Sequence, residues 1–345
     1  MTLGWMIGMA GKLGIGVIGC GGMGTSLAKT CLKIPYIEVV ATCDPIETQA
    51  RILATDMNCD HYSRVDDLLG RSDIDAVIVA TPNFNHCEST VAALKAGKHV
   101  FCEKPMALTL KDCDLMIHTA EDSGLTLMIG HVMRFYSGCA SVKEAMETGE
   151  IGLPVLISAS RSGWVEVGEW KESWRHRKEL CGDSLFESAI HEIDLMRWFF
   201  GDVQTVQAYG SNFGHPELEY DDCTIAIFRF ENGALGALQA GYAYKAGDHK
   251  IVLNGTKGAA CIDFETSTAR LIAEAKTEHV EPLMKGTELV WLGGLIAELQ
   301  HFAGCTSRGM KPLVDGWEGR RAVEIVTAID QAAESGKSVD LPLEY

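Results

Sequence analysis

The sequence has no closely spaced cysteine pair, although it contains twelve cysteines in 345 residues. The cysteines are scattered from Cys20 to Cys305, and none belongs to a C-x-x-C pair of the kind that zinc sites and thiol redox motifs use. Disulfide frameworks are typical of short secreted chains, and this chain is long. We therefore expect reduced, buried cysteines and no metal site.

Long apolar runs and excess positive charge are also missing. No run reaches the length that spans a bilayer, and residues 1–12 lack the basic start and the small-residue cleavage site of a signal peptide. These residues are either an N-terminal extension, or translation begins at Met6 or Met9. The formal net charge of −17 argues against nucleic acid and anionic membranes as partners, because both repel an acidic surface. We predict a cytoplasmic protein.

The length and composition predict a globular protein of two domains. A chain of 345 residues is too long for one ordinary core. Its apolar fraction of 47% and charged fraction of 22% are typical of globular proteins. We predict domains at residues 1–130 and 131–345, and the last segment is a candidate to pack back on the first domain.

A glycine-rich turn near the N-terminus predicts a dinucleotide site. Residues 13–18 read as a strand, the turn follows the pattern G-x-G-x-x-G, and residues 25–34 read as a helix. Gly19 permits the tight turn, Gly21 lets the backbone approach a pyrophosphate, and Gly24 lets the helix pack on the strand. The helix N-terminus offers N–H groups to the phosphates. The predicted cofactor-binding positions in this turn are Gly19, Gly21, Gly22, Met23 and Gly24.

Asp44 ends the next predicted strand, about twenty residues beyond the glycine turn, at the spacing of an acid that binds the adenosine ribose. A carboxylate there accepts hydrogen bonds from the ribose hydroxyls and repels a 2′-phosphate, which favours NAD over NADP. The alternative is that Asp44 only begins a turn with Pro45.

Strands and helices keep alternating up to residue 130, which predicts a Rossmann-type, doubly wound parallel sheet in an α/β domain. Residues 81–83 and 103–105 each follow a predicted strand, at the edge of the sheet where ligands bind in such folds. The predicted strands are residues 37–43, 76–80, 99–102 and 125–129, and the predicted helices are residues 48–56, 65–69, 87–96 and 110–123.

Lys104 stands at the end of the strand predicted at residues 99–102. A lysine beside a nicotinamide ring is positioned to move protons while a hydride moves, which predicts an oxidoreductase. Pro105 fixes the backbone just after it. The alternative is an ordinary surface lysine, because most lysines are exposed.

Residues 182–200 read as an amphipathic helix. Glu187, His191 and Asp194 fall at i, i+4 and i+7, so we expect them to share one face. Carboxylates beside a histidine can orient its ring and tune its basicity, which predicts acid–base chemistry. The alternative is an exposed acid–base pair or a satisfied buried histidine. The apolar side of the helix is predicted to be Leu185, Ala189, Ile193 and Met196.

Aromatic and basic residues of the second half are further candidates. Trp174 offers an aromatic face that suits the C–H face of a sugar, and Arg175 suits hydroxyls or a carboxylate, although packing in the core or rim is the alternative. Arg134 is a candidate substrate-binding residue at the rim of the expected ligand cleft, whereas His131 is predicted to be structural. Tyr242 either binds a sugar or covers a sheet edge.

The rest of the second half is rich in strands. Residues 231–233 and 254–258 are hairpin signals between strand-like segments, and two helices, residues 292–306 and 317–335, close the chain. We predict a C-terminal α+β domain with one large, mainly antiparallel open sheet.

The stretch TPNFNHCESTVAALKAGKHVFCEKPMALT, residues 81–109, resembles the Gfo/Idh/MocA oxidoreductases. That family includes inositol dehydrogenases, glucose-fructose oxidoreductase and many sugar dehydrogenases. The resemblance covers nearly the whole chain, because the glycine turn, the E-K-P tripeptide, the helix with Glu/Asp-x-x-x-His-x-x-Asp and the segment 316–342 all match. These motifs are specific for the family and say little about the substrate.

The resemblance implies roles for individual residues. Lys104 is implied to contact both nicotinamide and substrate. His191 and Asp194 match the family's helix without change, whereas Glu187 replaces the usual aspartate and either joins the proton relay or only binds a substrate hydroxyl. The catalytic residues are therefore predicted to be Lys104, His191 and Glu187. The further cofactor-binding residues are predicted to be Asp44, Thr81, Asn83, His86, Glu103, Lys104, Trp174 and Arg175. The substrate-binding residues are predicted to be Lys104, Arg134, Trp174, Glu187, His191, Asp194 and Tyr242.

The sequence thus predicts an NAD-dependent dehydrogenase that oxidises a CH–OH group of a sugar, glycoside or inositol to a ketone. One alternative is a redox-neutral enzyme that retains NAD, either for oxidoreduction between two sugars or for glycoside cleavage through a keto intermediate. Others are a non-catalytic sugar- or NAD-sensing regulator and a reductase of the biliverdin-reductase type. The resemblance also implies a homodimer or homotetramer, because a second subunit's sheet covers the open face in this family.

Overall fold

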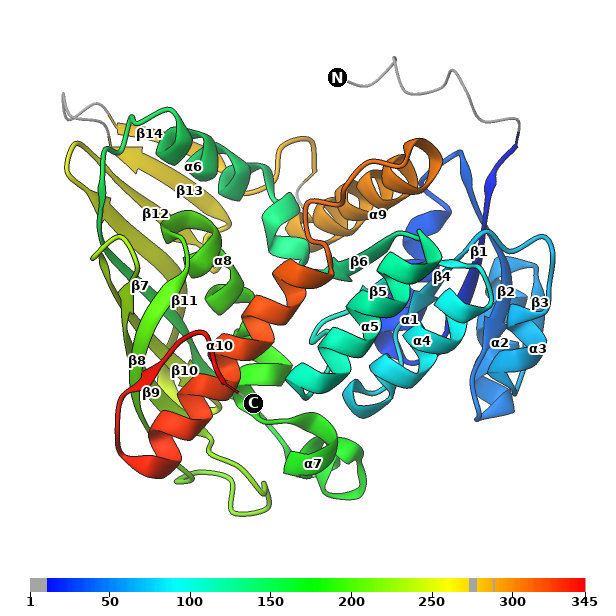
Figure 1. Ribbon diagram of the computed structural model, residues 1–345, viewed down its shortest axis with the longest axis horizontal. Coiled ribbons are helices and arrows are strands. Elements are labelled where there is room, and N and C mark those ends of the chain that lie inside the picture. Colours follow the sequence, from blue (N-terminus) through cyan, green and yellow to red (C-terminus); the bar gives the residue numbers. More distant parts are fainter. Residues whose placement is uncertain (1–10, 273–277, 288, 345) are drawn as a thin grey trace. The chain divides into compact units, whose positions relative to one another are not determined.

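The computed structural model describes residues 11–272, 278–287 and 289–344, so most of the predicted N-terminal extension lies outside the described residues. The chain forms two compact units (Figure 1). The first comprises Met1–Ala107, Lys111–Gly130 and Leu295–Trp317, and the second comprises Leu108–Leu110, His131–Gly294 and Glu318–Tyr345. Leu295–Trp317, which the sequence assigns to the second domain, therefore belongs to the first unit. Within the described ranges, no helix combines the length and apolarity needed to cross a membrane.

The first unit contains a six-stranded parallel sheet with the order β3-β2-β1-β4-β5-β6. This is the order of a Rossmann fold, which reverses direction between β1 and β4 and forms a ligand-binding crevice there. The doubly wound sheet predicted from the sequence is confirmed. Its strands are β1 (Leu13–Ile18), β2 (Ile37–Cys43), β3 (Asp60–Tyr62), β4 (Ala76–Val79), β5 (His99–Glu103) and β6 (Leu127–Gly130).

The central strands are apolar because helices cover both faces of such a sheet. Every residue of β1 and β4 is buried. The short strand β3 was not predicted, since its Asp60 and His61 are exposed and give no apolar run. The helices of this unit are α1 (Gly22–Cys31), α2 (Glu47–Met57), α3 (Val65–Leu69), η1 (Asn83–Asn85), α4 (His86–Lys95), α5 (Leu110–Ser123) and most of α9 (Val290–Arg308).

The second unit contains a nine-stranded sheet with the order β14-β13-β12-β11-β7-β10-β9-β8-β15. Only β7 and β10 pair in parallel among these described strands, so the predicted mainly antiparallel sheet is confirmed. Both predicted hairpins form, as β9–β10 and β11–β12. The strands are β7 (Pro154–Trp164), β8 (Val203–Ser211), β9 (Cys223–Phe230), β10 (Leu235–Gly241), β11 (Ala243–Gly255), β12 (Ala259–Asp263), β13 (Thr268–Ile272), β14 (Glu278–Pro282) and β15 (Val339–Asp340).

Helices α6 and α8 pack on one face of this large sheet (Figure 1). The opposite face exposes large apolar side chains, among them Ile225, Ile227 and Leu235. The helices of the second unit are η2 (Val132–Phe135), α6 (Ser137–Glu147), η3 (Gly168–Glu172), η4 (Trp174–His176), α7 (Lys178–Cys181), the π-helix η5 (Leu185–Ala189), α8 (Ile190–Phe200) and most of α10 (Gly316–Ser335).

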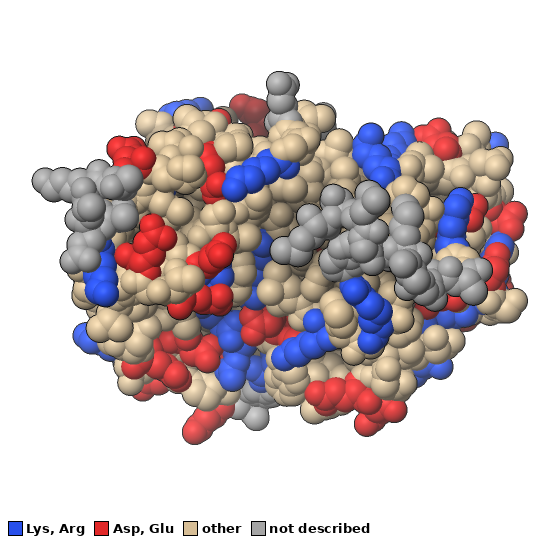
Figure 2. All heavy atoms as spheres, turned by 90° about the horizontal axis from the view of Figure 1, so that it is seen from above, with Lys and Arg blue, Asp and Glu red and all other residues tan. Residues whose placement is uncertain are grey.

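The charged side chains do not segregate on the face that Figure 2 presents. Lysines and arginines lie among aspartates and glutamates there, despite the net charge of −17. The described residues therefore form no extended basic surface on this face of the kind that binds a polyanion.

Candidate active site

The glycines in the turn after β1 fall into two groups: two pack closely against other backbone atoms, and two face open space. A Cβ on Gly24 would lie 1.9 Å from the Gly19 carbonyl oxygen, and Gly19 has a positive φ of 93° with the Ala80 carbonyl oxygen 2.5 Å from a Cβ. A Cβ on Gly21 or Gly22 would meet nothing within 4 Å. Gly19 and Gly24 are thus required for the fold, whereas Gly21 and Gly22 leave a cradle on the open side of the turn.

Helix α1 begins at this cradle, with Gly21 as its N-cap and Gly22 as its first residue. The first turn of α1 contains no acidic residue. The unpaired N–H groups and the helix dipole therefore favour an anion here. The cradle, the helix end and the position beside the reversal of strand order all fit the pyrophosphate of a dinucleotide.

Asp44 lies at the end of β2 and connects that strand to the glycine turn. Its Oδ2 accepts a hydrogen bond from the Cys20 N–H at 2.9 Å, and its Oδ1 accepts one from the Ile46 N–H at 2.9 Å. Asp44 therefore does begin a turn, which was one of the two interpretations. A carboxylate has about four acceptor positions, so these two bonds leave capacity for ribose hydroxyls.

His86 ties together the loops that follow β4 and β5. Its ring is buried, with Nδ1 2.7 Å from the Pro105 carbonyl oxygen and Nε2 2.9 Å from the Thr81 carbonyl oxygen. His86 was predicted as a cofactor-lining residue. Its burial and its two carbonyl partners favour a role in fixing these loops. Asn83 in the same loop is also buried.

Lys104 directly follows β5 and is half-buried. Its backbone N–H donates to Glu103 Oε2 at 3.1 Å, and the Glu103 side chain is itself buried. The backbone of Lys104 is therefore fixed by the residue before it and, through His86, by the β4 loop. In the first unit the structure thus collects Lys104, Glu103, Thr81, Asn83, His86 and the glycine turn at the carboxyl edge of one parallel sheet.

The predicted helix 182–200 is not one regular helix. It consists of the π-helix η5, which carries Glu187, and the α-helix α8, which carries His191 and Asp194. A π-helix has i→i+5 hydrogen bonds, so the spacing of side chains around the helix axis changes at residues 185–189. The regular α-helix predicted for this segment is therefore wrong there, while the shared face of Glu187, His191 and Asp194 stays a prediction. The apolar side predicted for this segment is buried.

His131 brings His191 and Asp194 together. The His131 and His191 rings meet edge-to-face with centroids 5.7 Å apart, and His131 Nδ1 lies 3.9 Å from Asp194 Oδ2. His131 is completely buried. It was predicted to be structural, and its position makes it the ring against which His191 is oriented.

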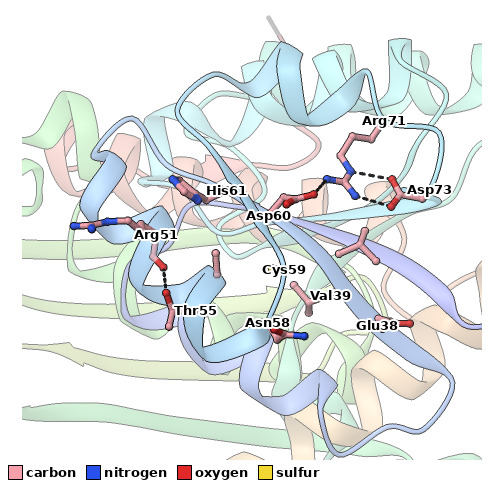
Figure 3. A pocket seen from close by; sticks show the side chains of 12 residues that line it. Glu38, Val39, Arg51, Thr55, Asn58, Cys59, Asp60, His61, Arg71 and Asp73 are labelled. Carbon is pink, nitrogen blue, oxygen red and sulfur yellow. Dashed lines mark hydrogen bonds and ion pairs between the residues drawn. The ribbon is translucent and has the colours of Figure 1, made fainter.

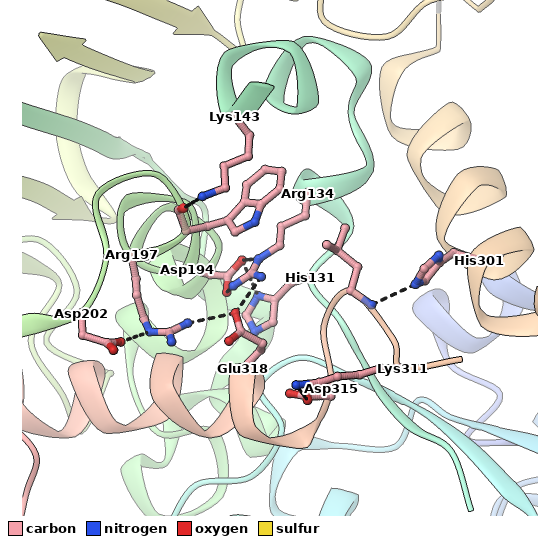
Figure 4. A network of polar contacts seen from close by, with 12 residues as sticks. His131, Arg134, Lys143, Asp194, Arg197, Asp202, His301, Lys311, Asp315 and Glu318 are labelled. Atoms are coloured by element: carbon pink, nitrogen blue, oxygen red, sulfur yellow. Dashed lines mark hydrogen bonds and ion pairs between the residues drawn. The ribbon is translucent and has the colours of Figure 1, made fainter. Parts of the chain in front are cut away.

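Arg134 and Asp194 form a buried bidentate ion pair (Figure 4). Arg134 Nε donates to Asp194 Oδ2 at 2.8 Å and Nη2 donates to Oδ1 at 2.6 Å, while Nη1 lies 2.8 Å from Glu318 Oε2. Arg197 also binds Glu318, at 2.9 Å. Both Arg134 and Asp194 are at most 2% exposed. This arrangement favours support of α8 and does not favour the direct substrate contact predicted for these two residues.

The ion pair controls the ionisation of Asp194. Burial alone would raise the pKa of this carboxyl, but the charges of Arg134 and His131 and the hydrogen bonds from Arg134 outweigh burial and lower the pKa below its usual range. Asp194 therefore stays ionised and keeps its position at neutral pH.

Asp194→Ala is expected to lower the free energy of unfolding by about 3–5 kcal/mol, because it leaves the buried Arg134 guanidinium without the carboxylate that pairs with two of its nitrogens. Denaturant unfolding measures the loss. The matched control is the double variant Arg134→Met/Asp194→Leu, which removes both charges and should recover much of the stability. A single variant as stable as the wild type would contradict this account.

Glu187 is held by Arg175. Arg175 Nε donates to Glu187 Oε1 at 2.9 Å, its guanidinium lies 4.4 Å from the centroid of the Trp174 ring, and its carbonyl accepts the Tyr220 hydroxyl at 2.8 Å. Burial, and then the charge of Glu187, raise the pKa of the nearby Tyr242 hydroxyl well above its usual value. This cluster joins four predicted site residues in the second unit, and Tyr220 is a member that the sequence analysis missed.

Tyr242 is 5% exposed and packs edge-to-face on Trp170 with ring centroids 5.5 Å apart. No described residue hydrogen-bonds its buried hydroxyl. A buried hydroxyl usually has a partner, so this group is suited to one that the protein does not supply.

Asp183 was missed by the sequence analysis, although its position after Gly182 and before a helix is an N-cap signal. Its Oδ1 accepts hydrogen bonds from the N–H groups of Leu185 at 2.8 Å and Phe186 at 3.0 Å. Asp183 thereby caps the π-helix that carries Glu187.

Burial and the neighbouring Asp183 raise the pKa of the Asp330 carboxyl to about 8, against the opposing charge of Lys178.

Asp330→Asn is expected to make stability less dependent on pH. A carboxyl whose pKa is raised on folding stabilises the fold while it is protonated, and this contribution is lost as pH rises from about 4, its unfolded pKa, to about 8. The melting temperature of the variant relative to the wild type should therefore increase between pH 5 and pH 8 and then level off. Thermal melts across this range measure it, and parallel curves for the two proteins would contradict it.

One hollow of the first unit lies away from the glycine turn. A cavity of about 600 Å³ opens beside the first residues of β2 and the end of α2 (Figure 3). Its Arg71 pairs with Asp60 and, at 2.6 Å, with Asp73, so its charges largely compensate one another. None of the predicted site residues lines it.

Comparison with known proteins gives matches over almost the entire chain. A family model described as "Oxidoreductase family, NAD-binding Rossmann fold" of the Gfo/Idh/MocA type matches residues 13–131, and the model of its C-terminal alpha/beta domain matches residues 143–341. The 2,7-anhydro-N-acetylneuraminate hydratase of Escherichia coli is 33% identical over 268 residues, which cover 76% of this chain and 71% of the relative.

Two further similarities span nearly the full length. Myo-inositol 2-dehydrogenase of Thermotoga maritima is 29% identical over 337 residues, with 95% of this chain and 98% of the relative covered. The crystal structure of an aldose-aldose oxidoreductase from Caulobacter crescentus, complexed with glycerol, superposes with a TM-score of 0.86 at 25% identity, covering 96% of this chain and 100% of that one.

Proposed function

Because this chain belongs to the Gfo/Idh/MocA oxidoreductase family with its NAD-binding Rossmann fold, we propose that it oxidises a hydroxyl of a sugar, glycoside or inositol to a ketone. The observation that carries the proposal is Lys104, half-buried at the end of β5 on the same sheet edge as the open glycine cradle. In a doubly wound sheet this edge receives the ligand. A lysine held at that edge is suited to acid–base catalysis, whereas an ordinary surface lysine serves mainly solubility.

In the proposed reaction His191 takes the proton of the substrate hydroxyl, while the Lys104 ammonium stabilises the negative charge that develops on that oxygen. NAD, when bound, would accept the hydrogen of the carbon that bears this hydroxyl, together with its electron pair. The hydroxyl proton thus ends on His191, and a C=O bond replaces the C–H and O–H bonds.

Glu187 and the residues around it are proposed to bind the substrate. Arg175 keeps the Glu187 carboxylate in place, so that it accepts a hydrogen bond from a substrate hydroxyl. The Tyr242 hydroxyl and the Trp174 ring supply a polar group and an apolar face in the same cluster, which suits a sugar or polyol. Trp174 and Arg175 also stay proposed as neighbours of the nicotinamide.

Asp44 supports NAD as the preferred cofactor. Its carboxylate is fixed at the end of β2 by two backbone N–H groups, where it can accept ribose hydroxyls and would repel a 2′-phosphate.

A second candidate keeps this chemistry but returns the hydride within one turnover. The relative from Escherichia coli is named as a hydratase and the structural relative as an aldose-aldose oxidoreductase, and neither name describes a net transfer of electrons to free NAD. These relatives favour a redox-neutral enzyme that retains NAD and either exchanges oxidation between two sugars or cleaves a glycoside. A sugar- or NAD-sensing regulator is a weaker alternative, because a sensor does not need Lys104 and His191.

The two candidates are separated by the fate of the nucleotide. Purified protein is denatured and its released NAD(H) is measured, and steady-state NADH formation is followed with inositols, free sugars and glycosides. Exchangeable nucleotide with continuous NADH formation supports the dehydrogenase. Nucleotide that copurifies, with sugar conversion and no net NADH, supports the redox-neutral enzyme. Sugar binding without conversion of any panel member would indicate the regulator.

We also propose a homodimer or homotetramer that pairs the open face of the large sheet. Ile225, Ile227 and Leu235 are each between 47% and 57% exposed on this face. Light scattering should show a dimer or tetramer for the wild type and a smaller species for Ile225→Lys/Ile227→Lys, because two buried lysines would face each other across the contact. A monomeric wild type would contradict this assembly.

A further inference from the structure

Glu298 on α9 is a buried carboxyl that the proposed mechanism does not use. It is completely shielded from solvent, and no N–H or O–H group of the described residues donates a hydrogen bond to either of its oxygens. An ionised carboxylate without a partner is very costly in such surroundings, so Glu298 holds its proton. A neutral carboxyl then has one O–H to donate.

The packing of α9 on β5 directs Glu298 toward Glu103. Phe302 of α9 meets Phe101 of β5 edge-to-face, with ring centroids 5.8 Å apart. Glu298 precedes Phe302 by four residues and so lies on the same helix face. Glu103 follows Phe101 by two residues and so lies on the same side of the strand. The two contacting faces therefore bring both carboxyl groups to one place.

Electrostatics agree with this placement. Burial, and then the charge of Glu103, raise the pKa of Glu298 well above its usual value. A Cβ on Gly130 of β6 would lie 3.1 Å from Glu103 Oε1, so the Glu103 carboxyl lies against the backbone of β6. A protonated Glu298 adds no second negative charge beside Glu103.

We propose that Glu298 is a positioning residue for Lys104: neutral Glu298 donates its O–H toward Glu103 and fixes the carboxylate that accepts the Lys104 backbone N–H. The Glu103 carboxylate holds the Lys104 backbone through this N–H, so a shift of the carboxylate would loosen the hold on the lysine. Misplacement of a catalytic group by about 1 Å can cost a hundredfold in rate. This inference rests on the proposed role of Lys104.

The first test is independent of activity and asks whether Glu298 is protonated. The infrared difference spectrum between the wild type and Glu298→Gln at neutral pH should contain the C=O band of a protonated carboxylic acid. The band should persist at mildly alkaline pH. Its absence from a folded wild-type protein would overturn the proposal.

The second test compares Glu298→Gln with Glu298→Leu. The glutamine keeps a neutral N–H donor, and the leucine removes the donor at similar volume. We expect Glu298→Gln to stay near wild-type turnover and Glu298→Leu to lower kcat roughly tenfold or more, with the dissociation constant of NAD unchanged. Equal kcat for Glu298→Leu and the wild type, or equal losses in both variants, would overturn the proposal.

A third readout separates this inference from the proposed function. The rate at which an amine-acylating reagent modifies Lys104, followed by peptide mass spectrometry, should change in Glu298→Leu and not in Glu298→Gln. If Lys104→Met leaves turnover normal, the proposed function fails while the labelling result still stands. If Glu298→Leu does not fold, the infrared test on the wild type still decides the protonation of Glu298.

Discussion

Lys104→Met is expected to lower turnover by roughly two to four orders of magnitude, while the affinity for NAD changes little. The variant removes the positive charge that stabilises the developing oxyanion and leaves the backbone bond to Glu103 available, because that bond uses the Lys104 N–H. Methionine keeps the length and apolar stem of the side chain. The effect should therefore fall on kcat.

Steady-state kinetics and NAD titration of the same preparation measure this split. Lys95→Met is the matched control, since Lys95 is an exposed lysine of the same unit near the end of α4. The control should have wild-type kinetics. Normal turnover in Lys104→Met would remove the lysine from the mechanism.

Gly21→Val is expected to weaken NAD binding by roughly a hundredfold, or about 3 kcal/mol, without a loss of stability. Gly21 has an extended backbone that valine tolerates, and a Cβ there meets no protein atom within 4 Å. The added methyl groups would occupy the space through which a pyrophosphate approaches the backbone. Calorimetric titration and thermal melts measure the two quantities.

Two glycine controls distinguish obstruction from damage. Gly163→Val also adds a side chain in open space, but on β7 of the second unit, and should leave both NAD binding and stability unchanged. Gly24→Ala should lower the melting temperature, because its Cβ would collide with the Gly19 carbonyl oxygen. Undiminished NAD affinity in Gly21→Val would contradict the placement of the cofactor at this turn.

The first unit could be predicted closely because its signals are local. Buried strands, glycine positions and helix caps each follow from a few consecutive residues, and the alternation of strand and helix then determines the sheet. The assignment of Leu295–Trp317 to this unit could not be predicted in the same way. Nothing in the sequence of α9 specifies which sheet its apolar face covers. Glu298, an acid within this apolar helix, was the one sequence signal of an unusual buried position in α9.

The candidate site was predicted less completely, since its contacts join distant residues. Glu187, His191 and Asp194 were predicted as site residues, but their regular spacing gave no sign of the π-helix that carries Glu187. The Arg134–Asp194 ion pair joins residues 60 positions apart. The sequence therefore predicted that Arg134 binds substrate and gave no sign that it supports α8. Such roles depend on packing, which periodicity does not describe.

The central claim is that a sugar or polyol hydroxyl delivers hydrogen to NAD on this protein. The most direct measurement is rapid mixing of the protein, saturated with NAD, with each member of a panel of inositols, free sugars and glycosides, while the absorbance of NADH is recorded within a single turnover. We expect a rise in absorbance with at least one member, sustained for a dehydrogenase and transient for a redox-neutral enzyme, and a much slower rise in Lys104→Met. A panel member that is converted to product while no NADH forms at any time would contradict it.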